Sequence, residues 1–345
     1  MSIDYKQSGV DIDAGNEAVR RIKDKVKATF DKNVVTGLGT FGAMYDLSEI
    51  KQYKHPILVQ SIDGVGTKLK VASLMKSYRS VGHDIVNHCC DDVLCQGARP
   101  FTFLDYVAAG KLKPEIIEEI VTGMAEACQA ARVNLIGGET AEMPGVYVEG
   151  EHDIVGCVTG VVEKDNIITG DSIRAGDLLI GFASSGLHTN GYSLARKLFF
   201  EIGSFEVHDT IPELGETVGA ALLKPHVNYV NPVFGLIDGG VEVKGIAHLT
   251  GGGFIENIPR MLPENVGVEI QTGSWPVLPV FQVMQRLGDI SDREMYRTFN
   301  MGIGLIVVVG PEQQKTLEKI LGTYDGFKTY GVGRVISGEK KVNFI

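Results

Sequence analysis

The first half of the chain alternates between helix-like and strand-like apolar patterns. Apolar residues recur every three or four positions through residues 14–30, which predicts a helix that Asp13 can cap. Further helices are predicted at about 80–96 and, beginning at Pro114, to about Arg132. Short and nearly continuous apolar runs predict strands at 56–62, 101–108, 133–138 and 153–162.

The second half repeats this mixture. Apolar runs predict strands at 178–183, 245–250, 266–270, 302–310, 328–336 and 341–344. Helices are expected from about 190, across 213–238, from 254, from 277 and near 312–322. The polar stretch 163–177, with two turn signals, separates the halves. We therefore expect an α/β (or α+β) protein with mixed sheets flanked by helices, and two domains, 1–165 and 166–345.

Charge and cysteine content narrow the classes of function. The formal net charge of −10 argues against a sequence-independent grip on nucleic acid, which needs a basic face. It still allows a local cluster of donors to bind a phosphorylated small molecule. Five cysteines without a CxxC pair, and no signal peptide, fit a reducing cytoplasm. The apolar runs are far shorter than the ~20 residues of a membrane helix.

Four acidic residues of the first half lie at positions where the surrounding apolar residues predict burial, which is energetically unfavourable for an unpaired carboxylate. Asp63, Asp105 and Glu139 lie in or just after apolar, strand-like runs. Asp92 shares a face of the second predicted helix with apolar residues, whereas its neighbour Asp91 points elsewhere. Oxygen ligands without a His/Cys set favour magnesium, which is usually shared with nucleotide phosphates. The alternative is that each acid caps a helix or a turn.

The run DGVGTK (63–68) combines three elements of a phosphate site. It offers a metal ligand in Asp63, glycines that let backbone N–H groups approach oxygen atoms, and the ammonium of Lys68. The alternative is a tight turn with a surface lysine.

The glycine-rich stretch 37–42 imitates a dinucleotide-binding fingerprint, because Asp63 follows about 20 residues later. That motif should follow a solid strand, and only Val34-Val35 precedes it here. A mobile flap over ATP is the favoured interpretation and a plain loop is the alternative. The chain has no P-loop signature, so an ATP site must be of another type.

Two polar loops of the second half precede predicted helices. Residues 184–193 contain His188, a candidate general acid or base, although a lone histidine is more often structural. Residues 248–253 end in three glycines, and free N–H groups at a helix start make an anion site. A substrate phosphate fits there, and ordinary helix entry is the alternative.

Together these segments resemble the phosphoribosylformylglycinamidine cyclo-ligase (aminoimidazole ribonucleotide synthetase) family. The segments are GVDIDAGN (9–16), DGVGTK (63–68), FLDYVAAGKL (103–112), GGETAEMPG (137–145), SSGLHTNGYSL (184–194), HLTGGGFIENIPR (248–260) and EMYRTFNMGIG (294–304). They occur in order over essentially the full chain.

The resemblance implies a fold, a reaction and partners. The fold would be the two-domain architecture also found in formylglycinamidine ribonucleotide amidotransferase, selenophosphate synthetase and thiamine-monophosphate kinase. The first domain would bind ATP and magnesium and pair with a second subunit as a cytoplasmic homodimer. The second domain would bind formylglycinamidine ribonucleotide, which would be closed to aminoimidazole ribonucleotide in purine biosynthesis.

The resemblance also implies roles for individual residues. ATP would be bound by Lys23, Gly37, Gly39, Gly42, Asp63, Gly64, Thr67, Lys68, Asp92, Asp105 and Glu139, and magnesium by the four acids among them. Substrate would be bound by Ser185, His188, Asn190, Gly191, Thr250, Gly251, Gly252, Gly253 and Asn257. His188 and Lys68 would be catalytic. The family often has Asn-Asp where this chain has Asp91-Asp92, which leaves open which of the two binds the metal.

Three competing interpretations follow. The amidotransferase has the same core but is normally much longer or has partner subunits. A selenophosphate synthetase would carry a reactive cysteine in its glycine-rich loop, and residues 33–45 contain none. A nucleotide-binding regulator without turnover is disfavoured by the retained acids and by Lys68.

Overall fold

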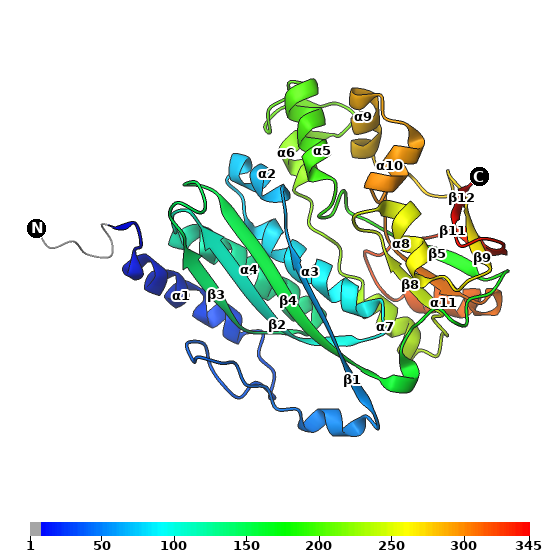
Figure 1. Cartoon of the computed structure of the whole chain (residues 1–345), viewed down its shortest axis with the longest axis horizontal. Helices are drawn as coiled ribbons and strands as arrows, with labels where there is room; N and C mark the ends of the chain where they lie inside the picture. Colours follow the sequence, from blue (N-terminus) through cyan, green and yellow to red (C-terminus); the bar gives the residue numbers. More distant parts are fainter. Residues whose placement is uncertain (1–7) are drawn as a thin grey trace, which may run out of the picture. The chain divides into compact units, whose positions relative to one another are not determined.

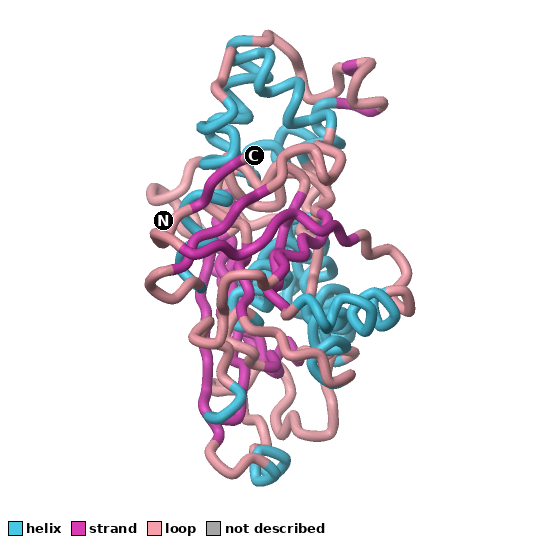
Figure 2. The backbone as a smooth tube through the Cα atoms, turned by 90° about the vertical axis from the view of Figure 1, so that its right-hand side faces the viewer, coloured by secondary structure: helices cyan, strands magenta, loops and turns pink. Residues whose placement is uncertain are grey.

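The computed structural model describes residues 8–345, which form two compact units. The first unit contains the described residues up to Val93 together with Ala98–Asp165, and the second contains Leu94–Gly97 with Asn166–Ile345. The first seven residues of the predicted domain 1–165 lie outside the described part. Strands and helices are mixed along the whole described chain, as Figures 1 and 2 show. The predicted mixed fold is therefore confirmed.

The first unit is built on a four-stranded sheet in the order β1-β4-β2-β3. The strands are β1 (Pro56–Gly64), β2 (Arg99–Ala109), β3 (Asn134–Glu142) and β4 (His152–Glu163). β4 pairs antiparallel with both β1 and β2, whereas β2 and β3 are parallel. The parallel pair requires a crossover, and the amphipathic helix α4 (Pro114–Ala131) supplies it.

Helices cover one face of this sheet. α3 (Arg79–Leu94) and α4 lie behind it in Figure 1, and α1 (Ile12–Lys27) packs on α4. A Cβ on Gly82 of α3 would lie 2.1 Å from the carbonyl oxygen of Ile120 on α4, so glycine allows the two helices to touch. The core lies between these helices and the sheet, where Ile85, Phe103 and Ile120 are fully buried.

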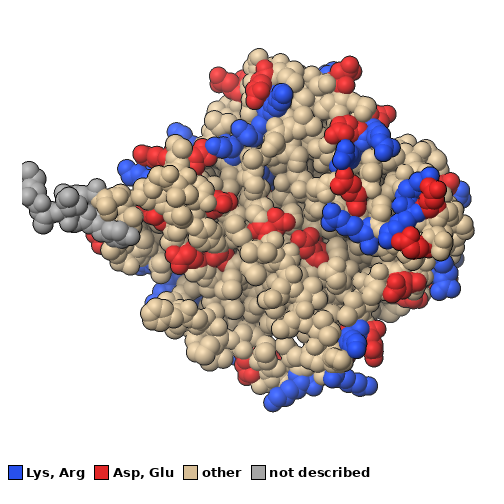
Figure 3. Space-filling model, in the orientation of Figure 1, with Lys and Arg blue, Asp and Glu red and all other residues tan. Residues whose placement is uncertain are grey.

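The other face of the sheet carries exposed apolar side chains. Leu58 and Ile62 of β1 are 56% and 69% exposed, and Leu104 of β2 is 42% exposed. Figure 1 shows no helix over this face, and Figure 3 shows it to be mostly uncharged. A contiguous apolar face of this kind is typical of an interaction surface.

The second unit contains a six-stranded sheet in the order β12-β9-β11-β5-β10-β8 and a small β6-β7 hairpin. Its strands are β5 (Leu178–Ala183), β6 (Thr210–Ile211), β7 (Glu216–Thr217), β8 (Gly245–His248), β9 (Val266–Ile270), β10 (Ile303–Val309), β11 (Thr329–Ser337) and β12 (Val342–Phe344). Its α-helices are α5 (Tyr192–Arg196), α6 (Val218–Leu222), α7 (Val230–Asp238), α8 (Gly253–Met261), α9 (Pro279–Gly288), α10 (Asp292–Thr298) and α11 (Gln314–Leu321). All pairs in the six-stranded sheet are antiparallel except β12 with β9. The central strand β10 is buried along its whole length.

The structure corrects the predicted start of the first helix. α1 begins at Ile12, and its cap is Asp11 rather than Asp13. The Asp11 carboxylate accepts hydrogen bonds from the backbone N–H groups of Asp13 (3.1 Å) and Ala14 (3.2 Å). Asp11 has the extended backbone that a capping residue needs, whereas Asp13 is already helical.

The apolar pattern did not predict two of the α-helices. α2 (Lys68–Met75) is short, and its buried residues include a lysine, which breaks the apolar pattern. α10 is only seven residues long. Within residues 8–345, no helix has both the length and the apolar character that crossing a membrane requires.

Candidate functional site

Three side chains on α3, each four residues apart, meet three side chains of the segment that runs from β1 into α2. The pairs are Asp92 with Ser61 (3.0 Å), His88 with Asp63 (2.9 Å) and Asp84 with Lys68 (2.7 Å). Residues at this spacing lie on one face of a helix, so α3 presents a polar stripe to the DGVGTK run. This stripe organises the predicted phosphate-site residues of the first unit.

Asp63 is held at both carboxylate oxygens. Oδ1 accepts the backbone N–H of Gly64 at 2.7 Å, and Oδ2 accepts Nε2–H of His88. Partial burial acts to raise the pKa of Asp63, but the hydrogen bond and charge of His88 and the Gly64 N–H together lower it. The carboxyl group is therefore ionised at neutral pH, and its side chain remains 42% exposed. An ionised, accessible carboxylate is suited to a cation.

His88 was not among the predicted site residues. Its side chain is 6% exposed, and Nε2 also faces Oδ2 of Asp92 at 3.7 Å. Burial acts to lower the pKa of His88, but the hydrogen bond to Asp63 and the charges of Asp92 and Asp84 outweigh it and raise the pKa. The helical spacing of His88 and Asp92 was visible in the sequence, but the partner of His88 depended on how α3 packs against β1.

The structure rules out the alternative that Lys68 is a surface lysine. Its side chain is fully buried in the first turn of α2, whereas its predicted role at the nucleotide stays a prediction. Its Nζ contacts both carboxylate oxygens of the fully buried Asp84, at 2.9 and 2.7 Å. Burial lowers the pKa of Lys68, and the charge of Asp84 opposes this effect. In this structure the ammonium is therefore the counter-ion of Asp84.

The neighbours Asp91 and Asp92 differ in accessibility. The Asp92 side chain is 31% exposed, whereas Asp91 is fully buried. The expectation that the two side chains point to different sides agrees with this difference. Of the two, Asp92 is the one that solvent and a soluble ion reach in this structure.

The other two predicted metal ligands lie on opposite faces of the sheet. Asp63, Gly156, Asp105 and Gly138 form one row across the four strands, so Asp63 and Asp105 share the face that the helices cover. Glu139 is in register with Tyr106 and therefore points to the other face, where it is exposed. The expected set of four acids around one metal is thus not formed within the first unit as described.

Asp105 has a different protonation behaviour from Asp63. A Cβ on its neighbour Gly138 would lie 2.2 Å from Oδ1 of Asp105, so the carboxyl group leans over the sheet beneath the helices. Burial raises the pKa of Asp105 to about 7, and the negative charge of Glu139 adds to this shift. A substantial fraction of Asp105 is therefore protonated near neutral pH, which makes it a poor resting ligand for a cation.

The glycine-rich loop 37–42 is open. A Cβ on Gly37, Gly39 or Gly42 would meet no atom within 4 Å, and Phe41 is fully exposed. Within residues 8–345, the loop is flanked by a single β-bridge between Val34 and Tyr45, and the element before it is a helix. This arrangement lacks the strand that a dinucleotide fingerprint requires. The last predicted ATP contact outside these elements, Lys23, is exposed on α1.

In the second unit, the structure buries His188 among aromatic rings. Its side chain is fully buried, and its φ of 63° lies in the left-handed region. Nε2 accepts the backbone N–H groups of Ser185 (3.4 Å) and Val227 (3.5 Å). The ring stacks on His226 at 4.0 Å, and Nε2 of His226 lies 3.0 Å from Nε2 of His248. Sequence reasoning missed His226, because nothing local marks it as a partner of His188.

The loop 250–253 is closed by a buried amide. Asn257 donates from Nδ2 to the carbonyl oxygens of Thr250 (3.2 Å), Gly251 (3.2 Å) and Gly253 (2.9 Å). A Cβ on Gly253 would lie 2.2 Å from a carbonyl oxygen of Tyr296, so only glycine fits there. Asn257 thus shapes the loop at the start of α8.

The two polar loops of this unit lie side by side. A Cβ on Gly251 would be 3.4 Å from Oδ1 of Asn190, whose own amide nitrogen contacts Thr189. Gly191 has φ 76°, and a Cβ there would strike the ring of Phe299 at 2.3 Å. The substrate residues predicted from the two loops are therefore gathered in one region.

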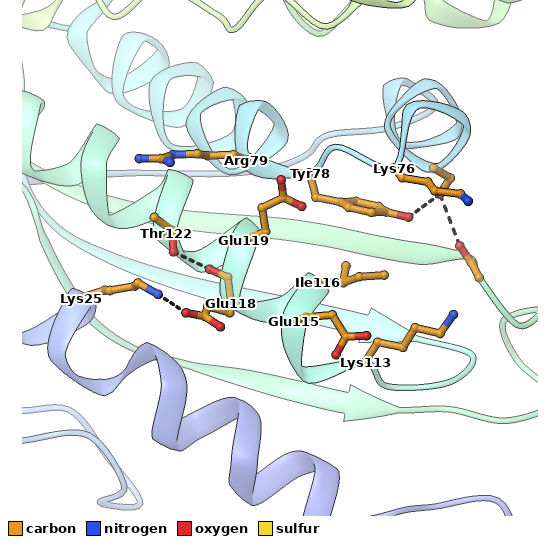
Figure 4. Close-up of a pocket in the computed structure, with 12 residues that line it drawn as sticks. Lys25, Lys76, Tyr78, Arg79, Lys113, Glu115, Ile116, Glu118, Glu119 and Thr122 are labelled. Carbon is orange, nitrogen blue, oxygen red and sulfur yellow. Dashed lines mark hydrogen bonds and ion pairs between the residues drawn. The ribbon is translucent and has the colours of Figure 1, made fainter. Parts of the chain in front are cut away.

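A pocket of about 1030 Å³ in the first unit is lined by residues of α1, α2, α3 and α4 (Figure 4). Lys25, Arg79, Lys113 and Glu119 are among its lining residues, and Lys25 pairs with Glu118. None of the predicted site residues lines it. Its lining contains both basic and acidic side chains, so it offers no concentrated charge of one sign for a phosphate.

Comparison with known proteins assigns the chain to a family. Residues 46–162 match the model of the N-terminal domain of AIR synthase related protein, and residues 174–344 match that of its C-terminal domain. A phosphoribosylformylglycinamidine cyclo-ligase of Thermoanaerobacter pseudethanolicus is 51% identical, and the alignment covers 98% of each chain. The enzyme of that name from Brevibacillus brevis is 52% identical over 99% of this chain and 98% of its own.

Solved structures show the same fold at low sequence identity. Thiamine-monophosphate kinase from Stenotrophomonas maltophilia K279a aligns with a TM-score of 0.67, 16% identity and coverage of 94% of this chain and 95% of that one. Hydrogenase maturation protein HypE in complex with ATP aligns with a TM-score of 0.65, 18% identity and coverage of 98% and 92%. The chain belongs to the AIR synthase related family and, within it, to the phosphoribosylformylglycinamidine cyclo-ligases.

Proposed function

We propose that this protein uses ATP to close the ring of formylglycinamidine ribonucleotide, giving aminoimidazole ribonucleotide, ADP and phosphate in purine biosynthesis. The observation that carries this proposal is the Asp63 carboxylate, ionised, half-exposed and held by His88 and Gly64 at the start of the DGVGTK run. The names of relatives about 50% identical over nearly the whole chain supply the reaction.

Asp63 and Asp92 fit a magnesium ion better than the other acids do. Both are carboxylates, both are accessible, and both adjoin His88 on the same stripe of α3. Magnesium bound there would neutralise charge on the ATP phosphates. Glu139, on the other face of the sheet, is proposed as a contact to the nucleotide rather than to the same ion. Asp105 has a raised pKa and would bind the ion only when its carboxyl group is ionised.

The remaining phosphate-side residues have separate parts in this proposal. Gly64 and Thr67 lie on the run that leads into α2, and loop 37–42 has room to approach a nucleotide. Lys23 is exposed and free to reach a phosphate from α1. Lys68 supports the run through its pair with Asp84 instead of contacting the nucleotide.

The reaction requires activation of a poor electrophile. The formyl oxygen attacks the γ-phosphorus of ATP, the bond to the β-phosphate oxygen breaks, and ADP leaves. The internal amine nitrogen then attacks the activated carbon, loses a proton, and the carbon–oxygen bond breaks to release phosphate. Both reacting groups belong to one substrate, so the protein contributes mainly position, charge neutralisation and a proton acceptor.

The second unit supplies the proposed substrate site. Loop 250–253 opens α8 and offers backbone N–H groups to a ribonucleotide phosphate. Ser185, Asn190 and Gly191 of the neighbouring loop would contact the rest of the substrate. His188 is proposed as the general base that accepts the proton lost by the attacking nitrogen. Because His188 is buried, substrate binding must open a path to it.

We also propose a cytoplasmic homodimer in which the uncovered faces of two first-unit sheets meet. Exposed Leu58, Ile62 and Leu104 support this arrangement, because burying them together removes apolar surface from water. The five cysteines are free thiols, which suits a reducing compartment.

The direct test is an ADP-release assay with formylglycinamidine ribonucleotide, with the product identified by mass. We expect ADP and a product mass that matches ring closure, in equal amounts and only when both substrates and magnesium are present. ATP binding without substrate-dependent ADP would instead indicate a nucleotide-binding regulator.

A further inference from the structure

His88 occupies a specific place between two acids of the first unit. Its Nε2 is 2.9 Å from Oδ2 of Asp63 and 3.7 Å from Oδ2 of Asp92. The ring is almost entirely buried, whereas both carboxylates are partly exposed. A buried donor therefore stands behind two accessible acceptors.

The direction of the hydrogen bond follows from the acceptor. Oδ1 of Asp63 accepts the Gly64 N–H, and Oδ2 faces Nε2 of His88 at 2.9 Å; a carboxylate only accepts hydrogen bonds, so the proton of this contact lies on Nε2. This holds for the neutral ring and for the imidazolium alike. The contact is therefore a donation to Asp63 whatever the charge of His88.

This donation limits the freedom of Asp63. With Gly64 N–H on Oδ1 and His88 on Oδ2, rotation of the carboxylate would break two hydrogen bonds. Each oxygen still has a lone pair for a cation, because a carboxylate offers about four acceptor positions. Ser61 fixes the Asp92 carboxylate in a similar way, with a hydrogen bond to Oδ2 at 3.0 Å.

We infer that His88 is a positioning residue for the magnesium–nucleotide site, which holds the Asp63 carboxylate in its ligating orientation by donating Nε2–H. This inference rests on the proposed role of Asp63 and Asp92. It assigns His88 no contact with substrate or nucleotide.

The test compares His88→Gln with His88→Met. Gln places an amide N–H near the position of Nε2, whereas Met fills the space without a donor. Manganese binding, followed by electron paramagnetic resonance with a non-hydrolysable ATP analogue, measures the site without turnover. We expect H88M to weaken manganese binding by about 10- to 100-fold, as is typical for loss of a group that orients a ligand, and H88Q to restore most of it.

A matched control lies on the same helix. His83 pairs with Glu126 at 3.0 Å and touches none of the proposed ligands, so H83M should leave manganese binding unchanged. Melting temperatures of all three variants show whether each is folded. Equal defects in folded H88M and H88Q, or wild-type binding by H88M, would overturn the inference.

A double-mutant cycle covers the case in which H88M is poorly folded. In metal-free protein, the stability losses of H88M and D63N should be clearly less than additive, because each removes the same hydrogen bond. Additive losses would contradict the inference. If D63N binds manganese as tightly as wild type, the proposed magnesium site is wrong. If D63N weakens manganese binding but H88M does not, the magnesium site stands and only the proposed role of His88 is wrong.

Discussion

Lys68 and Asp84 form an ion pair in which neither side chain has any exposed surface. The ammonium lies within 2.9 Å of both carboxylate oxygens and joins the first turn of α2 to α3. Taking a charge out of water is costly, so each of these buried charges is tolerated only while the other is present to neutralise it.

This pair predicts a pattern of stability in variants. K68M or D84L alone leaves one buried charge without its partner and should reduce the free energy of unfolding by about 3–5 kcal/mol. The double variant K68M/D84L removes both charges and should recover much of that loss. Urea denaturation of the four proteins measures the coupling between the two sites.

The same double variant tests the role of Lys68. If Lys68 is only a counter-ion of Asp84, the folded double variant should have a KM for ATP near that of wild type. A stable double variant that no longer binds ATP would show that Lys68 reaches a phosphate during the reaction. Arg79→Met, which removes an exposed pair with Glu126, is a suitable control for loss of an ion pair elsewhere.

Asp63→Asn should abolish turnover and leave the fold intact. The amide keeps the shape of the side chain but loses the negative charge that attracts magnesium, and its NH2 end faces either the His88 donor or the Gly64 N–H donor. ADP release should fall to background while far-UV circular dichroism stays unchanged. Removal of magnesium with a chelator should abolish wild-type turnover in the same way, and turnover by D63N would exclude Asp63 from the site.

Asp105 predicts a pH dependence of stability in the metal-free protein. Its folded-state pKa of about 7 lies above the unfolded value of 3.8, so between these values the folded state binds more protons than the unfolded state. The contribution of Asp105 to stability is therefore fully present below about pH 4 and is lost as pH rises through 7. Asp105→Asn should raise the melting temperature at pH 8 and have less benefit at pH 5. An equal effect at both values would show that the carboxyl group titrates normally.

Asn257→Ala should affect substrate binding more than ATP binding. The buried amide donates to three carbonyl groups of loop 250–253, and its loss removes one hydrogen bond from each of them, at a cost of about 1–3 kcal/mol. We expect a higher KM for formylglycinamidine ribonucleotide and little change in the KM for ATP. Steady-state kinetics with each substrate varied in turn distinguishes this result from a general loss of folded enzyme.

Leu58→Lys and Ile62→Lys should convert the proposed dimer into monomers. Both positions are exposed on the uncovered sheet face, so lysine there leaves the fold of the unit intact but places charge in the interface. Sedimentation velocity measures the change. Leu74→Lys, at an exposed position on α2, is the matched control and should stay dimeric.

The amino-acid sequence by itself determined most elements and the identity of the chemical groups. Strand β5 was predicted at its observed limits, and helix α4 to within one residue, because both depend on local apolar periodicity. Asp63, Asp92 and the loop at 250–253 were marked by their contrast with apolar surroundings or by their glycines. These are signals within a few residues of chain.

Only the tertiary structure decided which groups meet. Asp84 lies 16 residues from Lys68, and His88 lies 25 residues from Asp63, so their pairing depends on how α3 packs against β1 and α2. The register of β2 with β3 placed Asp105 and Glu139 on opposite faces, although both follow similar apolar runs. His188 belongs to a buried histidine cluster because its ring stacks on His226, a contact that no local pattern indicates. Periodicity and composition act over a few residues, whereas strand register and helix packing join distant ones, and in this protein the latter set the partners of each charged group.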